Sequence, residues 1–240
     1  MKHLLVAVTA ALALAALPAL ASEATFERTL TVNGKVELSV STGSGNIHLT
    51  QGSGNQVHIF GRVKSSWGAS EERVREIAAH PPIEQTGNIV RIGGHHENLR
   101  NISIDYEIEA PAETYLEAGS GSGNITDEGV GINAKLSTGS GEIHATGLHG
   151  GFSAGTGSGN IKVGGTPASP WHLETGSGNV EFWAGNAALT LDAETGSGSI
   201  HTDKEMLTQG ASGRHHITGK INGGGPTVRI ETGSGDIRVH

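Results

Sequence analysis

Residues 156–161 read TGSGNI, and close copies of this hexad return along the whole chain. The other copies are TGSGNI 42–47, SGSGNI 120–125, TGSGEI 138–143, TGSGNV 175–180, TGSGSI 195–200 and TGSGDI 232–237. From Ser120 onward their first residues are separated by 18, 18, 19, 20 and 37 positions, and the longest interval contains a degenerate copy at 210–213. A repeat of this length is typical of a solenoid, in which each copy forms one rung.

The residues that flank each hexad alternate between apolar and polar types. Before the hexad at 138–143, Ala134 and Leu136 enclose Lys135, and the alternation resumes after the corner at Ile143. A period of two predicts a β-strand with one buried face. Strands this short bury that face only by stacking on the next copy, about 4.8 Å away. The sequence therefore predicts an all-β, parallel β-solenoid (β-helix-like) with rungs of roughly 18–20 residues.

The Gly-Ser-Gly part of each hexad is predicted to turn the chain from one strand into the next. Glycine suits such a corner because it adopts positive φ without steric cost. The Asn or Ser that follows is expected to bond to corner backbone or to stack as a ladder. The predicted corner glycines are Gly43, Gly45, Gly121, Gly123, Gly139, Gly141, Gly157, Gly159, Gly176, Gly178, Gly196, Gly198, Gly233 and Gly235.

A recurring glycine-rich turn raises two ligand hypotheses, a phosphate and a calcium ion. Nucleotide loops need a third Gly or a following Lys and lead into a helix, whereas each hexad here leads into a strand. Calcium needs several anionic oxygens, but the position after Gly-Ser-Gly is acidic only at Glu142 and Asp236. Neither ligand is expected, and the repeat is interpreted as structural.

The first 21 residues, MKHLLVAVTAALALAALPALA, have the pattern of a signal peptide. Lys2 precedes an apolar run that ends in small residues, which predicts cleavage between Ala21 and Ser22. The mature protein is then expected in the periplasm or outside the cell, with a retained membrane anchor as the alternative. No later apolar stretch is long enough to cross a bilayer.

The mature chain is predicted to have two parts, an N-terminal β-rich lobe at 22–118 and the repeat solenoid at 119–240. In the lobe, Ser70 is the expected N-cap of a short helix over about 71–80, which Pro81 ends. The strands predicted in the lobe are 55–64, 83–92 and 101–110.

Charge and cysteine content exclude several classes of protein. The chain has 16 Lys and Arg against 24 Asp and Glu, a net charge of −8 that becomes −9 when the signal peptide takes Lys2 with it. This balance disfavours nucleic acid and anionic lipid as partners. The chain has no Cys, so packing and backbone hydrogen bonds must stabilise an exported fold without disulfides.

The run YEIEAPAETYLEAGSGSGNI at 106–125, the strand–helix–strand segment before it and the recurring GSG-[Asn/Asp]-Ile corners together resemble a known family. They are similar to the bacterial "putative adhesin" domains, a family of unknown function found in secreted and envelope proteins. The resemblance covers roughly residues 30–240. It implies a β-solenoid without established catalytic residues, and it transfers no functional residue to this chain.

Outward positions in the later rungs carry the candidate binding groups. Register places Glu174 and Glu194 side by side in one column, with Glu231 further along and Asp192 two residues before Glu194. Paired carboxylates suit a glycosidase, while like charges on an open face are equally an ordinary solvated surface. Trp183 either stacks on a sugar ring or packs over the corner that follows it. The candidate binding residues are Trp183, Glu174, Glu194, Asp192 and His172.

Histidine pairs are the candidates for metal ligands, namely His95 with His96 and His215 with His216. A dedicated zinc or copper site needs ligands that converge on one point with supporting contacts. Adjacent histidines in loops satisfy neither condition. Only adventitious metal affinity is expected, and no cofactor is predicted.

The resulting hypothesis is an exported, non-catalytic β-solenoid with an adhesin-like or scaffold role at the cell envelope. Its expected partners are a glycan or an envelope protein, and it has no predicted membrane span in the mature chain. Because the chain ends on a strand, self-association through an open C-terminal rung, 233–240, is a further expectation. The alternatives are a polysaccharide-degrading β-helix enzyme and an accessory protein that responds to envelope stress or metal.

Overall fold

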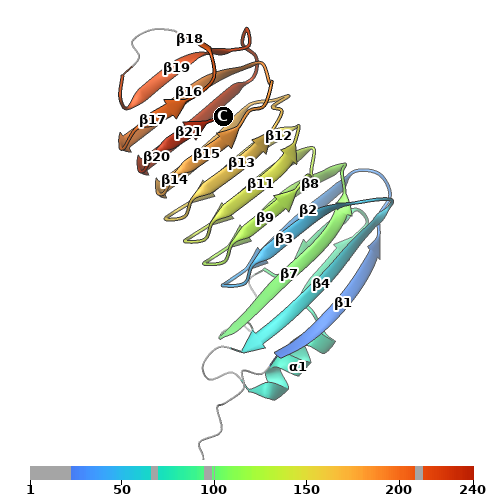
Figure 1. Ribbon diagram of the computed structural model, residues 1–240. Coiled ribbons are helices and arrows are strands. Elements are labelled where there is room, and N and C mark those ends of the chain that lie inside the picture. The colour runs from blue at the N-terminus through green and yellow to red at the C-terminus, as the bar shows by residue number, and fades with distance from the viewer. Residues whose placement is uncertain (1–22, 66–69, 95–98, 100, 209–212) are drawn as a thin grey trace, which may run out of the picture.

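The computed structural model describes residues 23–65, 70–94, 99, 101–208 and 213–240, which form two long sheets packed face to face (Figure 1). Sheet A has ten strands in the order β1 (Glu23–Thr31), β4 (Gln56–Ser65), β7 (Ile102–Pro111), β3 (Ile47–Gly52), β9 (Ile125–Glu128), β11 (Ile143–Leu148), β13 (Ile161–Gly165), β15 (Val180–Trp183), β21 (Ile237–Val239) and β17 (Ile200–Thr202). Sheet B has eleven strands in the order β18 (Met206–Thr208), β19 (His216–Ile221), β16 (Leu189–Ser197), β20 (Thr227–Ser234), β14 (Trp171–Ser177), β12 (Gly151–Thr156), β10 (Asn133–Thr138), β8 (Thr114–Ser120), β2 (Val36–Thr42), β6 (Ile89–Ile92) and β5 (Ile83–Thr86). The predicted signal peptide with its cleavage site, Ala21 and Ser22, lies outside the described residues.

Successive strands alternate between the two sheets through most of the chain, so each rung gives one strand to each sheet. Neighbouring rungs are parallel and in register, as in the pairing of Ile143 with Ile161. The inward side chains form one apolar core, in which the Trp171 ring lies 5.4 Å from that of Phe152 and 5.6 Å from that of Phe182. The predicted parallel β-solenoid is confirmed.

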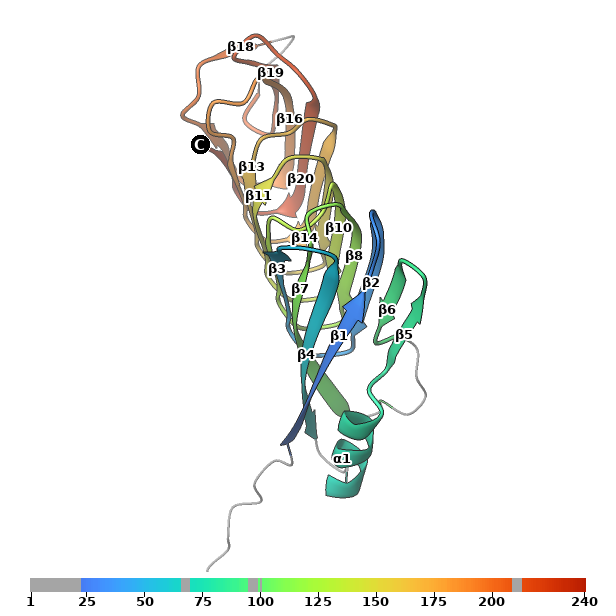
Figure 2. The ribbon, with the colours of Figure 1, turned by 90° about the vertical axis from the view of Figure 1, so that its right-hand side faces the viewer.

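The N-terminal end departs from the rung pattern. In sheet A, β1 and β7 both pair antiparallel with β4, and in sheet B a hairpin of β5 and β6 forms the edge (Figure 2). The prediction of one strand over 83–92 is wrong, because the chain turns back at Gly87, whose φ is 61°. Both sheets continue across position 118, and the division of the chain there stays a prediction.

The predicted helix is confirmed as α1 (Glu71–Ala79), at the end of the molecule that β1 and β4 form (Figure 1). Ser70 caps it, since its side chain accepts a hydrogen bond from the Arg73 backbone N–H. Val74 and Ile77 are buried on its inner face, which packs on β1 and β4. Within the described residues, no helix has the length and apolar character that crossing a membrane requires.

The C-terminal rung does not lie at the end of the stack. β20 inserts between β14 and β16, and β21 inserts between β15 and β17, so the last rung along the chain is an inner rung of the stack. The prediction of an open C-terminal rung is therefore wrong: both of its strands are paired on both sides. Of the degenerate copy predicted at 210–213, residues 210–212 lie outside the described residues. In the same interval, β18 and β19 run antiparallel on the edge of sheet B.

A buried column of hydroxyl groups joins the corners of successive rungs. In the hexad at 156–161, the Thr156 hydroxyl donates to the Gly141 carbonyl oxygen of the neighbouring rung (3.0 Å) and accepts from the Gly159 N–H (3.1 Å). The hydroxyls that donate in the same way are those of Ser120, Thr138, Thr175, Thr232 and Thr195, in that spatial order. Each therefore satisfies a corner carbonyl that would otherwise be buried without a partner.

A second column, of Asn and Asp side chains, bonds to the backbone of neighbouring corners, which is the first of the two predicted arrangements. The Asn160 Oδ1 accepts from the Asn179 N–H, the Asn179 Oδ1 from the Asp236 N–H, and the Asp236 Oδ1 from the Ser199 N–H, each at 2.9 Å. These bonds follow the order in which the C-terminal rung is inserted. The column lowers the pKa of Asp236, because Ser199 bonds to the carboxylate through its N–H and its hydroxyl.

The reason for the corner glycines differs from the predicted one. Of the fourteen predicted positions, only Gly198 and Gly235 have positive φ, at 155° and 158°. The others are required by close stacking: a Cβ at Gly159 would overlap the Gly141 carbonyl oxygen, and one at Gly141 would overlap that of Gly123. The exception is Gly43, where a Cβ would meet nothing within 4 Å.

This steric account is tested by Gly159→Ala against Gly155→Ala. The first adds a Cβ where the next rung's carbonyl already lies, and should cost at least about 2 kcal/mol of unfolding free energy. The second adds a Cβ with nothing within 4 Å, on a strand face, and should change stability by less than about 0.5 kcal/mol. Urea unfolding measures both. Equal effects of the two substitutions would contradict the account.

Among the described residues, Asp127 is the one Asp, Glu, Lys or Arg that lies in the core, with 0% of its surface exposed. Its Oδ1 accepts the Val130 N–H at 2.9 Å, while its Oδ2 has no hydrogen-bond partner. Burial raises the pKa of this carboxyl to about 7, against the Val130 hydrogen bond, and the nearby Glu128 charge adds to the rise. Through the Val130 hydrogen bond, the buried carboxyl stabilises the turn between β9 and β10.

Asp127→Asn should change how stability depends on pH. In the wild type the unfolded carboxyl ionises near pH 4 and the folded one near pH 7, so stability is highest in acid and falls as pH rises through this window. Asn cannot ionise, so the variant should gain about 2–4 kcal/mol relative to the wild type between pH 4 and pH 8. Thermal or urea unfolding at several pH values measures this. A pH-independent difference between the two proteins would show that Asp127 titrates normally.

Candidate binding surfaces

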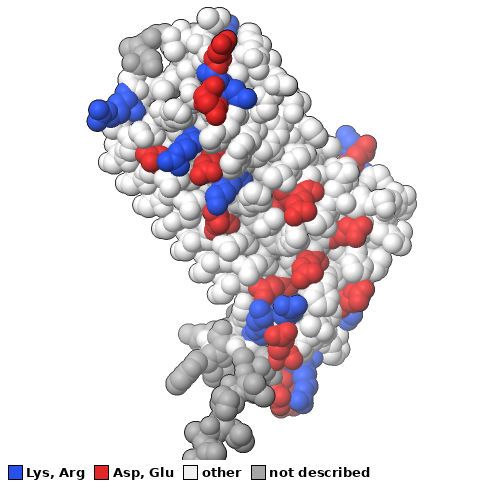
Figure 3. All heavy atoms as spheres, viewed as in Figure 1, with Lys and Arg blue, Asp and Glu red and all other residues white. Residues whose placement is uncertain are grey.

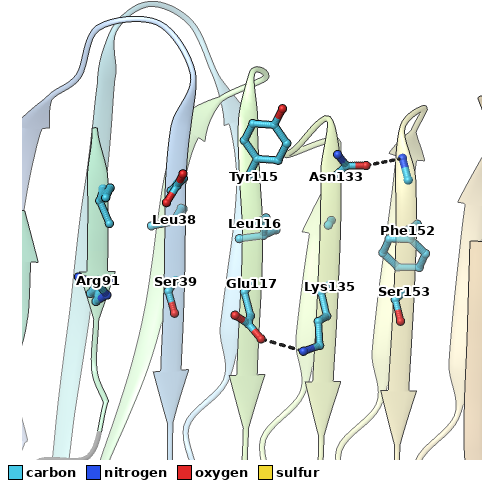
Figure 4. A pocket seen from close by; sticks show the side chains of 14 residues that line it. Leu38, Ser39, Arg91, Tyr115, Leu116, Glu117, Asn133, Lys135, Phe152 and Ser153 are labelled. Atoms are coloured by element: carbon cyan, nitrogen blue, oxygen red, sulfur yellow. Dashed lines mark hydrogen bonds and ion pairs between the residues drawn. The ribbon is translucent and has the colours of Figure 1, made fainter. Parts of the chain in front are cut away.

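The outer face of sheet B carries a groove of about 760 Å³ that crosses β6, β2, β8, β10 and β12 (Figure 4). Strand register aligns the outward residues into rows that run across the strands. One row contains Arg91, Ser39, Glu117, Lys135 and Ser153, and it forms the line of side chains across Figure 4. Ser39 and Ser153 have short side chains, whereas Arg91, Glu117 and Lys135 in the same row have long ones. The groove lies over the short side chains and is bordered by the long ones.

A second row contributes the aromatic and amide groups of the groove. Tyr115 is 39% exposed and lies opposite Asn133 on the next strand. The Asn133 Oδ1 accepts the Gly151 N–H at 3.0 Å, which fixes the amide plane. Below them, the Lys135 Nζ pairs with the Glu117 Oε1 at 2.9 Å. The groove thus combines one open aromatic ring with polar groups that neighbouring strands hold in place.

The groove was not among the predicted sites, although Tyr115 in the sequence pointed to it. Tyr115 occupies a polar position in the alternation of TYLEAGS, where an aromatic side chain must face outward. The other residues of the groove depend on which strands are neighbours, and this cannot be predicted from Tyr115 alone. Arg91, for example, reaches the groove because β6, the second strand of the edge hairpin, pairs with β2.

The carboxylate candidates lie further along the same face, in an order that differs from the predicted one. Glu174 and Glu194 are not neighbours, because Glu231 on the inserted β20 lies between them and pairs in register with both. Arg229 donates to the Glu231 carboxylate at 2.7 Å and lies 3.8 Å from that of Asp192. The predicted carboxylate pair is therefore a row of three acids with a guanidinium beside it.

This arrangement is a charged network rather than an acid–base pair. The Arg229 hydrogen bond lowers the pKa of Glu231, whereas a general acid needs a raised one. Two imidazoles border the network: the His172 Nε2 lies 3.4 Å from the Glu174 carboxylate, and the His216 Nε2 lies 3.0 Å from the Asp192 carboxylate. In the view of Figure 3, acidic and basic side chains alternate over the upper part of the opposite face as well.

The histidine pairs do not converge on a metal site in the part of the chain that the structure describes. His216 faces Asp192 and Thr218, while His215 is exposed and bonds through its backbone to Thr195. Among the described residues, no group of three or more His, Asp or Glu side chains is placed to hold a metal ion. His95 and His96 lie outside these residues.

Trp183 lies on the outer face of sheet A, on the opposite side of the molecule from the groove, and is 41% exposed. Its indole stacks on the His240 imidazole, with ring centroids 5.5 Å apart and planes inclined by 20°. The His240 Nδ1 lies 3.1 Å from the Asp203 carboxylate, and this hydrogen bond lowers the pKa of Asp203. Of the candidate binding residues, Trp183 is thus remote from Asp192, Glu174, Glu194 and His172, which sheet B brings together.

Fold and surface define a class: a two-sheet β-solenoid with open outer faces, one of which carries a row of acidic side chains around Arg229. The chain belongs to the toastrack DUF4097 family, whose model matches residues 23–240.

Solved structures that are similar over most of the chain are distant in sequence. A putative cell adhesion protein from Clostridium sporogenes is 15% identical, with a TM-score of 0.49 over 90% of this chain and 99% of its own. A putative adhesin from Bacteroides fragilis is also 15% identical, with a TM-score of 0.41 over 90% and 97%. A putative lipid binding protein from Parabacteroides distasonis is 11% identical, with a TM-score of 0.36 over 90% and 96%. No curated protein matches the chain.

Proposed function

We propose that the protein is an exported, non-catalytic, adhesin-like module that binds a glycan in the sheet B groove. The observation that carries the proposal is the open Tyr115 ring beside polar groups fixed by neighbouring strands. Ligand sites commonly combine such an apolar surface with a few oriented polar groups. Export rests on the predicted signal peptide, and the adhesin-like role agrees with the descriptions of the similar solved structures.

The polar groups of the groove suit hydroxyl-rich ligands. Because the Asn133 Oδ1 is engaged by Gly151, its amide NH₂ is the part left to donate toward a ligand. Glu117 and Lys135 supply an acceptor and a donor on adjacent strands, and their mutual ion pair restrains both long side chains. Restraint before binding lowers the entropy that a ligand must overcome. A sugar that stacks on Tyr115 would reach all three groups.

The solenoid also explains how one site becomes an extended surface. Outward side chains recur at each rung, about 4.8 Å apart, so the groove runs along the stack rather than ending in a closed pocket. Such a groove accepts a segment of a linear polymer better than an isolated small molecule. The negative net charge of the chain favours neutral or cationic glycans over strongly anionic ones.

The test is a glycan and envelope-component screen on the mature protein, with Tyr115→Ala and Thr227→Ala as a matched pair. Thr227 is an exposed outward residue of the same sheet, outside the groove. Tyr115→Ala should weaken binding about tenfold without lowering the melting temperature, since its ring lies outside the core. Thr227→Ala should bind as the wild type does.

Three outcomes would contradict the proposal: no glycan bound by the wild type, equal affinity in both variants, or turnover of a bound polysaccharide. Turnover would instead support the enzymatic alternative, and its loss in Glu194→Gln or Glu174→Gln would locate the reaction in the acidic row.

A further inference from the structure

Trp183 is placed as a platform with one occupied face and one open face. Its strand, β15, lies between β21 on one side and β13 on the other. His240, which follows β21, covers the indole face on that side by stacking. The other indole face is directed toward β13, where the residue opposite Trp183 is Gly164.

Gly164 leaves the space beside the indole empty. A Cβ built on Gly164 would find only the Cβ and carbonyl oxygen of Trp183 within 4 Å, at 3.7 and 4.0 Å, among the described residues outside its chain neighbours. The indole ring itself is not within this distance, so it does not fold down over the glycine. On the next rung beyond Gly164 the β11 strand bulges, so that Thr146 and the exposed Gly147 together lie opposite Gly164.

Polar side chains border this space on the same face of the sheet. Lys162 and Glu181 occupy the outward positions two residues before Gly164 and Trp183, and they pair in register. Lys162 Nζ is held by the Glu142 carboxylate at 2.9 Å, and Glu181 lies 3.8 Å from the Arg238 guanidinium. Each is therefore restrained by a partner while keeping capacity to bond to a ligand.

We infer that Trp183, backed by His240 and open over Gly164, is a stacking site for one pyranose ring with equatorial hydroxyl groups. Such a ring, as in glucose or N-acetylglucosamine, has an apolar C–H face that matches an indole face, and its hydroxyls lie at the ring edge. Lys162 and Glu181 meet that edge as donor and acceptor. The site lies on the opposite sheet from the groove, so it is a second sugar contact and does not require the first.

The support of the platform has a physical reason. An unsupported indole on a strand face samples several rotamers, and binding must then immobilise it. The stack on His240, whose imidazole is in turn held by Asp203, fixes the plane before a ligand arrives. The same arrangement directs the open face toward Gly164, the residue paired with Trp183 on β13.

The test uses the full mature chain with cellotetraose and chitotetraose as probes, and follows binding by calorimetry and by the NMR signal of the Trp183 indole N–H. Wild-type protein should bind at least one probe saturably and shift that signal. Trp183→Ala should weaken the affinity about tenfold or more, and Trp183→Phe should retain part of it.

Gly164→Val provides the decisive second variant. It keeps the indole but fills the space over the strand, at a position where the added Cβ makes only ordinary contacts. It should therefore abolish the indole N–H shift without loss of thermal stability. Tyr115→Ala, measured in parallel, should leave that shift unchanged.

The inference is overturned if the wild type binds neither tetrasaccharide, or if Trp183→Ala and Gly164→Val bind as the wild type does. A loss of affinity seen only in Tyr115→Ala would also overturn it, while supporting the groove. Binding that is lost only in the Trp183 and Gly164 variants would support this site and count against the groove, so the two proposals fail separately.

Discussion

The structure depends on the contact between the corner of one rung and the corner of the next. A buried threonine hydroxyl bridges the two corners, and glycines keep side chains out of the gap, so the backbones approach closely. Two consequences follow. The carbonyl groups that a tight stack would bury are satisfied, and each added rung must adopt the same register as the one before it.

This constraint leaves the two outer faces free to vary. Inward positions must be apolar and corner positions must be small, but outward side chains are restricted only by their neighbours on adjacent strands. The groove around Tyr115 and the platform at Trp183 both use this freedom, on opposite sheets. Tyr115 lies opposite Asn133 on the neighbouring strand, and Trp183 lies opposite Gly164.

Much of the fold could be predicted because it follows from local periodicity. Alternation around the hexads predicted the strands and the buried face, and Ser70 with the prolines predicted the helix. The order of the last rungs could not be predicted in this way. Every hexad offers the same corner, so chain order does not determine which rung stacks on which, and the segment after Pro226 occupies an inner place.

The surface sites were predicted less well for the same reason. Glu174 and Glu194 were expected side by side, but the inserted strand brings Glu231 and Arg229 between them and turns an acid pair into an ionic network. Trp183 was identified from its outward position alone. Its stack on His240 joins residues that are far apart in sequence, and it depends on the insertion of β21 beside β15. The position of Asn133 opposite Tyr115 likewise depends on which strands are neighbours.

The most direct test of the rung order, in which β20 stacks between β14 and β16, is disulfide trapping, because the chain has no cysteine of its own. Ser177 and Ser197 each pair in register with Ser234, whereas two rung spacings separate Ser177 from Ser197. Adjacent rungs place Cα atoms about 5 Å apart, within disulfide range, and a two-rung separation exceeds it. The account predicts that Ser177→Cys with Ser234→Cys, and Ser197→Cys with Ser234→Cys, form intramolecular disulfides, while Ser177→Cys with Ser197→Cys does not. A disulfide only in the last pair would contradict it.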